Sequence, residues 1–259
     1  MEDILLRELC EQITLSIVTV TCDDFIGLSK TISSLSELRN SSIELIIVDG
    51  SSSPLNFVKS DPQFKNFQEV KILSGPDRGI YDGMNKGLAI ARGKFVWFLN
   101  GGDSSLLKSI EFLDAYTCTD IPIIFGNYRI GMDRYAINRK AKKMKSIAHG
   151  LPTSHQAIFY PTNIFKKIGY DLKFKICADY ASIALLYSMG LNFDHISQEI
   201  AEFQLDGISG KNRNQLIREA NLIQKEILLL NRFQMLVSAI RHNASFIVRR
   251  CVYILGRRK

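Results

Sequence analysis

Three charged side chains in the first half of the chain each follow an apolar run and have chemistry suited to a nucleotide. Asp49 ends the run IELIIVD, Arg78 lies in SGPDRG after EVKIL, and Asp103 closes NGGD after KFVWFL. A carboxylate accepts hydrogen bonds from a base N–H or a ribose hydroxyl, and an arginine fork binds phosphate oxygens. A carboxylate can also hold a hard divalent cation that bridges diphosphate oxygens. Together these residue types favour a nucleoside diphosphate as ligand.

Each of these residues also has a structural interpretation, which the sequence leaves open. An aspartate followed by Gly-Ser-Ser-Ser, as at Asp49, is common in turns, and Arg78 taken alone is typical of a solvated side chain. Asp103 precedes residues that can begin a helix, so it is also a candidate helix cap. What favours a site is the expected meeting of all three at the carboxyl edge of one parallel sheet.

The elements that must position these residues alternate between strands and helices. Short β-branched runs predict strands at 15–20, 43–50, 69–73, 94–100 and 121–127. Apolar residues at helical spacing predict helices at 25–38, 80–91 and 105–116. Such alternation implies βαβ units, so we expect an α/β fold with a mostly parallel, Rossmann-like sheet flanked by helices.

The second half of the chain is more mixed. The patterns predict a strand at 155–161, helices at 162–169 and 178–190, and two short strands within 191–205. Residues 211–248 are predicted to be helical, in two segments. No repeat or low-complexity linker divides the chain, so one domain with a helical C-terminal appendage is the simplest interpretation.

Composition and charge narrow the classes of function. Of 259 residues, 46% are apolar and 23% are charged, which is typical of a globular protein. The net charge of +7 equals the seven cations that follow Glu226, where no acid occurs, so the rest of the chain is near neutral. Nucleic-acid binding is therefore not expected. Five scattered cysteines without a CxxC pair suit a reducing cytoplasm.

Motifs of several common enzyme classes are missing. The first strand is not followed by G-x-G-x-x-G, and neither GxxxxGK[ST] nor G-x-S-x-G occurs. These motifs form the phosphate-binding turns of dehydrogenases and P-loop nucleotidases and the nucleophile turn of hydrolases. Their absence argues against all three classes.

The stretches LSIVTVT, IELIIVDGSSS and GPDRGIYDGMNKGLAIARGKFVWFLNGGD resemble the family 2 glycosyltransferases of bacterial polysaccharide assembly. The likeness is greatest to enzymes of the colanic-acid and O-antigen type. It covers residues 14–103 closely and extends more weakly to about residue 210. The resemblance implies a GT-A fold, a nucleotide-sugar donor, a divalent cation (Mn²⁺ or Mg²⁺) and inversion at the anomeric carbon.

The same resemblance implies roles for five residues of the donor half. Thr19 and Asp49 would contact the nucleoside. Asp77 and Arg78 would line the donor site, and Asp103 would bind the metal at the position of the family's DxD motif. Many relatives carry two or three acids at this turn, whereas NGGD carries one. The metal is therefore expected to depend on the donor diphosphate for its other ligands.

The helix predicted at 80–91 would begin beside the donor sugar and diphosphate. Its N-terminal N–H groups and its dipole favour an anion. Asp82 and Asn85 lie three residues apart and share a face, from which they could bind sugar hydroxyls. The alternative is that Asp82 is only a favourable acid in a first helical turn, and the sequence leaves both interpretations open.

The second half is expected to bind the acceptor, whose hydroxyl an inverting transferase must deprotonate with a general base. The resemblance of KICADYASIALL to the family places that base at Asp179. The similar segment SHQAIFYP places His155 near the donor phosphate or the acceptor. An acid near a helix start is also a common capping residue, and a lone histidine is often structural.

Residues 227–255 place apolar side chains on one helical stripe, and every charged position there is basic. We expect this stripe to contact an anionic membrane surface, with the protein peripheral on the cytoplasmic face of the cell membrane. The alternative is a helix that packs on the domain.

These patterns predict a GT-A domain over 1–210, with a donor half at about 14–127 and an acceptor half at about 128–210, followed by a basic helical appendage over 211–259. The predicted function is transfer of a sugar, most readily from a UDP-sugar, to a hydroxyl of a lipid-linked oligosaccharide. The alternatives are a sugar nucleotidylyltransferase and a membrane-associated scaffold with a degenerate donor pocket.

Overall fold

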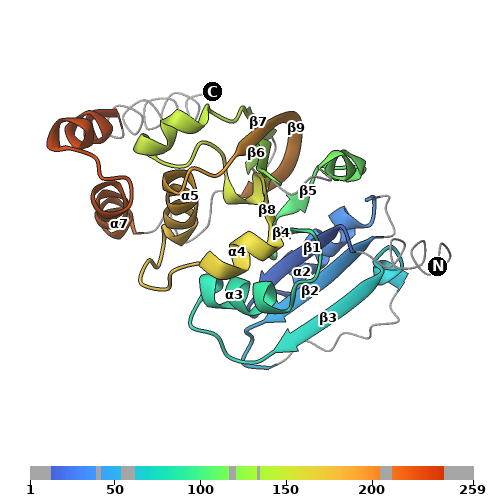
Figure 1. Ribbon diagram of the computed structural model, residues 1–259. Coiled ribbons are helices and arrows are strands. Elements are labelled where there is room, and N and C mark those ends of the chain that lie inside the picture. The colour runs from blue at the N-terminus through green and yellow to red at the C-terminus, as the bar shows by residue number, and fades with distance from the viewer. Residues whose placement is uncertain are drawn as a thin grey trace.

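A computed structural model gives the fold and describes residues 13–38, 42–53, 62–116, 121–132, 135–204 and 212–241. Within these ranges one sheet of nine strands forms the centre, in the order β3-β2-β1-β4-β8-β6-β9-β5, with β7 paired to β6 (Figure 1). Helices flank this sheet. The predicted α/β fold, with a mostly parallel sheet between helices, is confirmed.

Four parallel strands form the first half of the sheet. They are β1 (Leu15–Thr21), β2 (Ile43–Asp49), β3 (Glu69–Ser74) and β4 (Phe95–Phe98). Every residue of β1, β2 and β4 is buried, as expected of apolar runs in a sheet covered on both faces. The register pairs Thr21 with Asp49, and Asp49 with Ser74, so these strands end together at one edge.

Two helices cover opposite faces of these strands. α2 (Phe25–Leu35) shares a buried cluster with Ile17 of β1, and α3 (Ile80–Ile90) shares another with Val18. Successive side chains of a strand point to opposite faces of the sheet. The two helices therefore lie on opposite sides of β1.

Two glycines within α3 allow this helix to approach β1 very closely. A Cβ atom at Gly83 would lie 2.7 Å from Cγ1 of Val20, and one at Gly87 would lie 2.4 Å from Cγ1 of Val18. Both distances are well below van der Waals contact, so these positions exclude a side chain. The close packing holds the start of α3 at the edge where β1 and β2 end.

The second half of the chain adds the strands that curl the sheet. They are β5 (Ser104–Ser105), β6 (Ile123–Met132), β7 (Tyr135–Arg139), β8 (Ile158–Pro161) and β9 (Phe193–Gln204). β8 is antiparallel to β4 and β6, and β9 is parallel to β6. Because β5 follows β4 closely in sequence yet pairs with β9, the sheet curls back on itself. Helices α4 (Thr162–Ile168) and α5 (Ala178–Ser188) share the buried cluster of α3.

Three local predictions differ from the structure. The predicted helix at 105–116 is replaced by β5 and a 3-10 turn at Glu111–Ala115. The Ser105 hydroxyl accepts a backbone N–H two residues further on, a local bond that competes with a helix. Residues His155–Ala157 form a 3-10 turn instead of the start of a strand, and the two strands predicted within 191–205 form the single strand β9. Further 3-10 turns cover Pro62–Phe64 and Met144–His149.

Two helices follow the sheet, α7 (Arg213–Glu226) and a helix over residues 232–241. α7 buries Ile223 in the cluster that contains α5, and Glu219 accepts three consecutive N–H groups just before α5. α7 is therefore packed into the main body, whereas the sequence places it in an appendage. The rest of the predicted basic stripe lies outside the described residues. Within the described ranges no helix is both long and apolar enough to cross a membrane.

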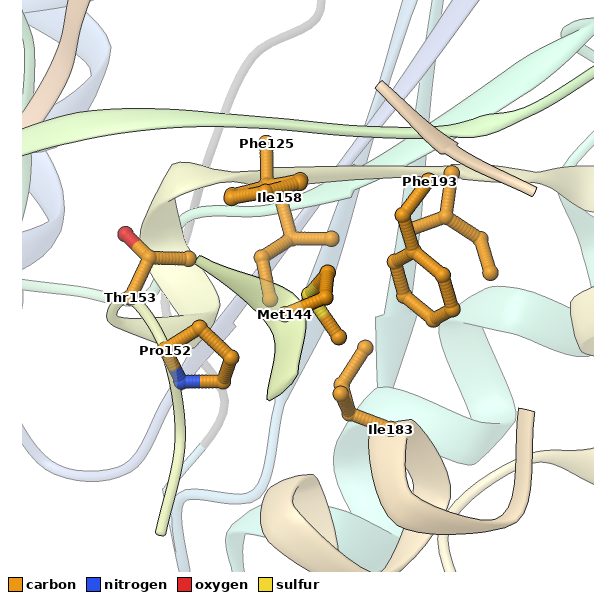
Figure 2. A pocket seen from close by; sticks show the side chains of 8 residues that line it. Phe125, Met144, Pro152, Thr153, Ile158, Ile183 and Phe193 are labelled. Atoms are coloured by element: carbon orange, nitrogen blue, oxygen red, sulfur yellow. The ribbon is translucent and has the colours of Figure 1, made fainter. Parts of the chain in front are cut away.

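A small pocket lies between β6, β8 and α5 (Figure 2). Its lining residues are Ile123, Phe125, Met144, Pro152, Thr153, Ile158, Ile183 and Phe193. The lining is almost wholly apolar, and none of the predicted site residues belongs to it. The candidate chemistry must therefore be sought at the edge where the parallel strands end.

Candidate active site

The carboxyl ends of β1, β2 and β4 bring two predicted loops together. The N–H of Gly50 donates to the carbonyl of Thr21 at 2.9 Å, and the N–H of Gly101 donates to the carbonyl of Val20 at 2.9 Å. The end of β1 is therefore flanked by the loop that follows Asp49 and by the NGGD turn. These loops lie far apart in sequence but share one edge of the sheet.

Side chains of α2 fix the shape of the NGGD turn. Thr31 Oγ1 accepts the Gly102 N–H at 3.0 Å and lies 2.7 Å from the carbonyl oxygen of Asp103. Lys30 Nζ donates to the Gly102 carbonyl at 2.9 Å. Gly102 itself has a φ of 94°, a conformation that favours glycine. Sequence reasoning missed Lys30 and Thr31 because they resemble ordinary positions of an amphipathic helix.

Asp103 is the buried carboxylate of this turn, with 9% of the residue exposed. Its Oδ2 accepts the Asn100 N–H at 3.2 Å and Gln156 Nε2 at 3.2 Å. Burial raises the pKa of Asp103 from 3.8 to about 6, although His155 and the bond from Gln156 act in the opposite direction. Such an environment disfavours an isolated negative charge and favours a bound cation.

The turn offers two oxygen atoms to a divalent cation. Both hydrogen bonds to the Asp103 carboxylate end at Oδ2, which leaves Oδ1 for a cation. Asn100 Oδ1 is buried and has no hydrogen-bond partner in the described part of the chain, an unfavourable state that a ligand would relieve. Carboxylate and amide oxygens suit Mn²⁺ or Mg²⁺. Among the described residues no three His, Cys, Asp or Glu side chains cluster to hold a metal, so the turn supplies only part of a coordination shell.

His155 connects this turn to Asp179. His155 Nε2 lies 3.4 Å from Asn100 Nδ2, and His155 Nδ1 lies 3.5 Å from Asp179 Oδ2, which is an ion pair when the imidazole is protonated. The His155 and Asp179 side chains are 16% and 15% exposed, so both are shielded yet reachable. The candidate metal ligands and the candidate base therefore belong to one group of contacts, assembled from β4, the turn before β8 and the start of α5.

Tyr81, at the start of α3, also contacts the candidate base. Its hydroxyl lies 2.8 Å from the Ile176 carbonyl oxygen and 3.3 Å from Asp179 Oδ1, so it can donate to either one. Burial and the Asp179 carboxylate raise the pKa of Tyr81 well above its usual range, which keeps the hydroxyl protonated. Tyr81 can therefore orient Asp179, a role that the sequence alone did not indicate.

Asp49 and Asp77 lie on the other side of the β1 end, around Cys22. Asp49 is almost fully buried and accepts the Ser51 N–H at 3.0 Å, while Asp77 accepts the Gly79 N–H at 2.9 Å. The pKa of the Cys22 thiol is raised by partial burial and by neighbouring carboxylates that include Asp77 and Asp49. The two acids therefore lie near the exposed thiol, with Asp49 buried beneath it. Sequence reasoning did not single out Cys22, although it directly follows β1.

Asp82 holds Arg78 at the start of α3. Asp82 Oδ1 accepts the Arg78 guanidinium at 2.9 Å, and Oδ2 accepts the Arg78 backbone N–H at 3.0 Å. These bonds lower the pKa of Asp82. The Arg78 side chain is 75% exposed, so most of its donors still face solvent. Asp82 is thus an acid of the first helical turn that also orients the arginine.

Two residues predicted to bind the donor differ in position from that expectation. Asn85 Nδ2 donates to the Tyr170 carbonyl at 2.8 Å, and Asn85 Oδ1 accepts the Tyr170 N–H at 2.9 Å, so both ends of the amide bind backbone. Thr19 is fully buried two residues before the end of β1, on the same strand face as Ile17. Neither side chain is placed to contact a donor, and we remove both from the candidate site.

Comparison with known proteins shows to which family a chain with this fold and this site belongs. Residues 16–178, more than half of the chain, match the family described as glycosyl transferase family 2. This chain belongs to glycosyl transferase family 2. The family match includes Asp49, Asp77, Asp103 and His155, and it ends one residue before Asp179.

Two family relatives come from mycobacteria. An uncharacterized glycosyltransferase of Mycobacterium tuberculosis is 33% identical over 177 residues. A PGL/p-HBAD biosynthesis glycosyltransferase of Mycobacterium bovis is 27% identical over 183 residues. Each alignment covers 64% of this chain and 66% of the relative, so about a third of each relative lies outside the alignment.

Solved structures of proteins with much lower sequence identity have a similar fold. The 1–349 fragment of S. aureus TarS has a TM-score of 0.63 and 15% identity, over 85% of this chain and 68% of the fragment. The same fragment in complex with UDP-GlcNAc has a TM-score of 0.62 and 13% identity. The longer TarS chain is covered only to 41%. At such identities the likeness establishes the GT-A fold alone.

Proposed function

We propose that this protein is a metal-dependent, inverting glycosyltransferase that moves a sugar from a UDP-sugar to a hydroxyl of a lipid-linked oligosaccharide during cell-surface polysaccharide assembly. The observation that carries the proposal is the continuous group of contacts from Asp103 through Asn100 and His155 to Asp179. A candidate metal-binding acid and a candidate base thus lie on either side of one imidazole. Membership of glycosyl transferase family 2 supports the reaction class.

The donor would bind across the end of β1. Asp49 and Asp77 lie where hydroxyl or N–H groups of a nucleoside can donate to them, and the exposed guanidinium of Arg78 can bind diphosphate oxygens. UDP as the nucleotide is supported by the likeness in fold to TarS, which has been solved with UDP and with UDP-GlcNAc. The transferred sugar would be a hexose or an N-acetylhexosamine.

Asp103 Oδ1 and Asn100 Oδ1 would hold Mn²⁺ or Mg²⁺ together with oxygens of the donor. A cation bound there would stabilise the negative charge that grows on the departing diphosphate. The chain's own contribution is the shape of the turn, which Thr31 and Gly102 fix from behind. Since only one carboxylate is present, the cation should bind weakly in the absence of donor.

Asp179 would act as the general base. Its carboxylate takes the proton of the acceptor hydroxyl as the acceptor oxygen forms its bond to the anomeric carbon. The bond from that carbon to the diphosphate breaks on the opposite face, and its electron pair leaves with the diphosphate, so the configuration inverts. His155 and Tyr81 contact the two Asp179 oxygens and hold them in place.

A direct test is to incubate the purified protein with Mn²⁺ and a panel of UDP-, GDP- and dTDP-sugars and to measure thermal stabilisation and sugar transfer or hydrolysis. A ligand that binds only the folded state raises the melting temperature. We expect a UDP-sugar to stabilise the protein, and EDTA or Asp179→Asn to abolish turnover. Stabilisation by no nucleotide-sugar would favour a scaffold with a degenerate pocket. Release of pyrophosphate from a nucleoside triphosphate would favour a nucleotidylyltransferase, an alternative that the family match weighs against.

A further inference from the structure

A basic segment begins at the last residue of β7 and continues to Lys145. Arg139, Lys140, Lys142, Lys143 and Lys145 are all exposed. The sequence contains no Asp or Glu from residue 134 to residue 170. In the described part of the chain none of these five cations forms an ion pair within 4 Å. The protein therefore carries a local excess of positive charge outside its C-terminal tail, at a segment that sequence analysis overlooked.

An exposed apolar ridge lies on the last described helix and the turn before it. Leu229, Phe233, Leu236 and Ile240 are 79%, 73%, 57% and 59% exposed. The spacing of three and four residues places Phe233, Leu236 and Ile240 on one face of the helix over 232–241, and Leu229 lies in the turn before that helix. The opposite face packs inward, because Ser238 is buried and accepts Gln224 Nε2 at 2.8 Å. The ridge is therefore not the face by which this helix packs on the domain.

The turn that presents the ridge has an unusual backbone. Leu229 has a φ of 51°, a left-handed conformation that is rare for a bulky residue and that glycine or asparagine adopts readily. The chain thus keeps a large apolar side chain, almost fully exposed, at a position where a small polar residue would fit the backbone better. This combination favours a role in binding over a role in folding.

A short series of buried contacts joins the basic segment to the ridge. The Tyr180 hydroxyl of α5 donates to the carbonyl of Ile147 at 2.7 Å, in the 3-10 turn that contains the last cation of the basic segment, Lys145. Tyr180 also belongs to the buried cluster that contains Ile223 of α7, and the next residue, Gln224, donates to Ser238. Figure 1 shows the 3-10 turn and the last helix on the side of the molecule away from α3 and β3. Both features therefore belong to one side of the protein.

We propose that these residues form a membrane-docking face, made of the five cations at 139–145, the apolar ridge, and Arg232 and Arg241, and that this face binds anionic lipid headgroups. The inference deepens the proposed function, since it names the surface that would bring a lipid-linked acceptor to the enzyme. Cations attract anionic headgroups, and the ridge enters the boundary between headgroups and acyl chains. A soluble polyanion would need the cations but not the ridge.

The docking face is also well placed for the reaction. Tyr180, which joins its two parts, directly follows Asp179 on α5. The helix that carries the candidate base is therefore anchored to the surface that faces the membrane. An acceptor held in the bilayer by its lipid could present its hydroxyl to Asp179 without leaving the membrane.

The test is sedimentation of the full chain with vesicles of phosphatidylcholine, with and without phosphatidylglycerol. We expect binding only to the anionic vesicles, and weaker binding as salt is raised. Lys142→Gln with Lys143→Gln should lower the partition coefficient about thirtyfold, given the usual contribution of each cation near an anionic surface. The matched control is Lys166→Gln with Lys167→Gln, an exposed lysine pair on α4 that should bind as the parent does.

A second variant tests the ridge without a risk to the fold. Leu229→Asn suits the left-handed backbone, so it should fold as well as the parent while losing several-fold in vesicle binding. The proposal would be overturned by equal binding of the Lys142/Lys143 and control variants, or by equal binding to neutral and anionic vesicles. It would also be overturned if the parent proved to be a stable dimer in solution and Leu229→Asn a monomer, since the ridge would then bind a second copy of the chain. Thermal stabilisation by a UDP-sugar is measured in parallel. If no UDP-sugar stabilises the parent protein although the protein still binds vesicles, the proposed function is wrong while the docking face is supported.

Discussion

At the residue scale, Asp103 has an environment that opposes its own charge. Burial raises the pKa of Asp103 to about 6, so the folded state holds this proton more tightly than the unfolded state, where the value is near 3.8. Stability from this group is fully present below about pH 4 and is lost as the pH rises through about 6. The free energy of unfolding of the metal-free protein should therefore be lowered at neutral pH by the buried charge of Asp103.

Asp103→Asn should remove this penalty. Asparagine can still accept the two hydrogen bonds but carries no charge. In EDTA the free energy of unfolding of the variant should therefore exceed that of the parent by up to about 3 kcal/mol near pH 7, and the two should be equal near pH 4. Urea unfolding across this pH range measures the difference. Asp114→Asn, at an exposed position, is the control and should show no such trend. If the free energies of unfolding of the parent and of Asp103→Asn changed with pH in the same way, burial would not raise the pKa of this carboxylate.

The residue scale also shows what the sequence could indicate about the site. Asp49 ends the buried strand β2 and Asp103 lies in the turn after the buried strand β4. A parallel sheet places such strand ends at one edge, so the positions of both residues were predictable. Thr19 was wrongly predicted to contact the donor because the local sequence does not show at which residue β1 ends. Asn85 was misassigned because its partner, the backbone of Tyr170, is a long-range contact that only the folded chain reveals.

At the element scale, α7 supports the start of α5. Glu219 accepts the N–H groups of Lys175, Ile176 and Cys177, each at 2.9 Å, and the last of these lies two residues before Asp179. The backbone bonds lower the pKa of Glu219 despite its burial, so the carboxylate stays ionised. An element beyond the family match thus holds the segment that leads to the candidate base.

Glu219→Gln should weaken this support. An amide presents an NH₂ group to three N–H donors, so at least one donor loses its partner, and we expect a destabilisation of about 1–3 kcal/mol. Because Asp179 would be less well held, kcat should fall while KM for the donor changes little. Urea unfolding and steady-state kinetics measure both effects, with Glu226→Gln at the exposed end of α7 as control. A donor KM that rises with kcat unchanged would contradict a positioning role for Glu219.

Some helices and strands could be predicted from the local sequence, and others could not. The buried strands β1, β2 and β4 were predictable because each is a short apolar run, and the helices α2 and α3 because their apolar residues recur at helical spacing. The segment 105–116 has helical periodicity too, yet its serine hydroxyls bind nearby N–H groups and β5 pairs with β9. That pairing joins residues about a hundred positions apart, and no local pattern could indicate it. The role of α7 in the core was missed for the same reason.

At the scale of the whole molecule, the end of β1 is where the separate parts of the chain meet. It lies between the loop after β2 and the NGGD turn, and the start of α3 is pressed against it through two glycines. From the NGGD turn, His155 extends the contacts to α5, which α7 supports and which the docking face adjoins. A donor bound across this edge would therefore cover the exposed thiol of Cys22, which sits among Asp49 and Asp77.

This arrangement predicts that a bound donor protects Cys22 from alkylation. With UDP and Mn²⁺ at about ten times the dissociation constant, labelling of Cys22 by iodoacetamide should slow about tenfold, because the free fraction falls in that proportion. Mass spectrometry of peptides separates Cys22 from the other cysteines, and the buried Cys177 serves as an internal reference that should label slowly throughout. In Asp103→Asn the protection should disappear if the cation links turn and diphosphate. Unchanged labelling of Cys22 under conditions where UDP raises the melting temperature would place the donor away from the end of β1.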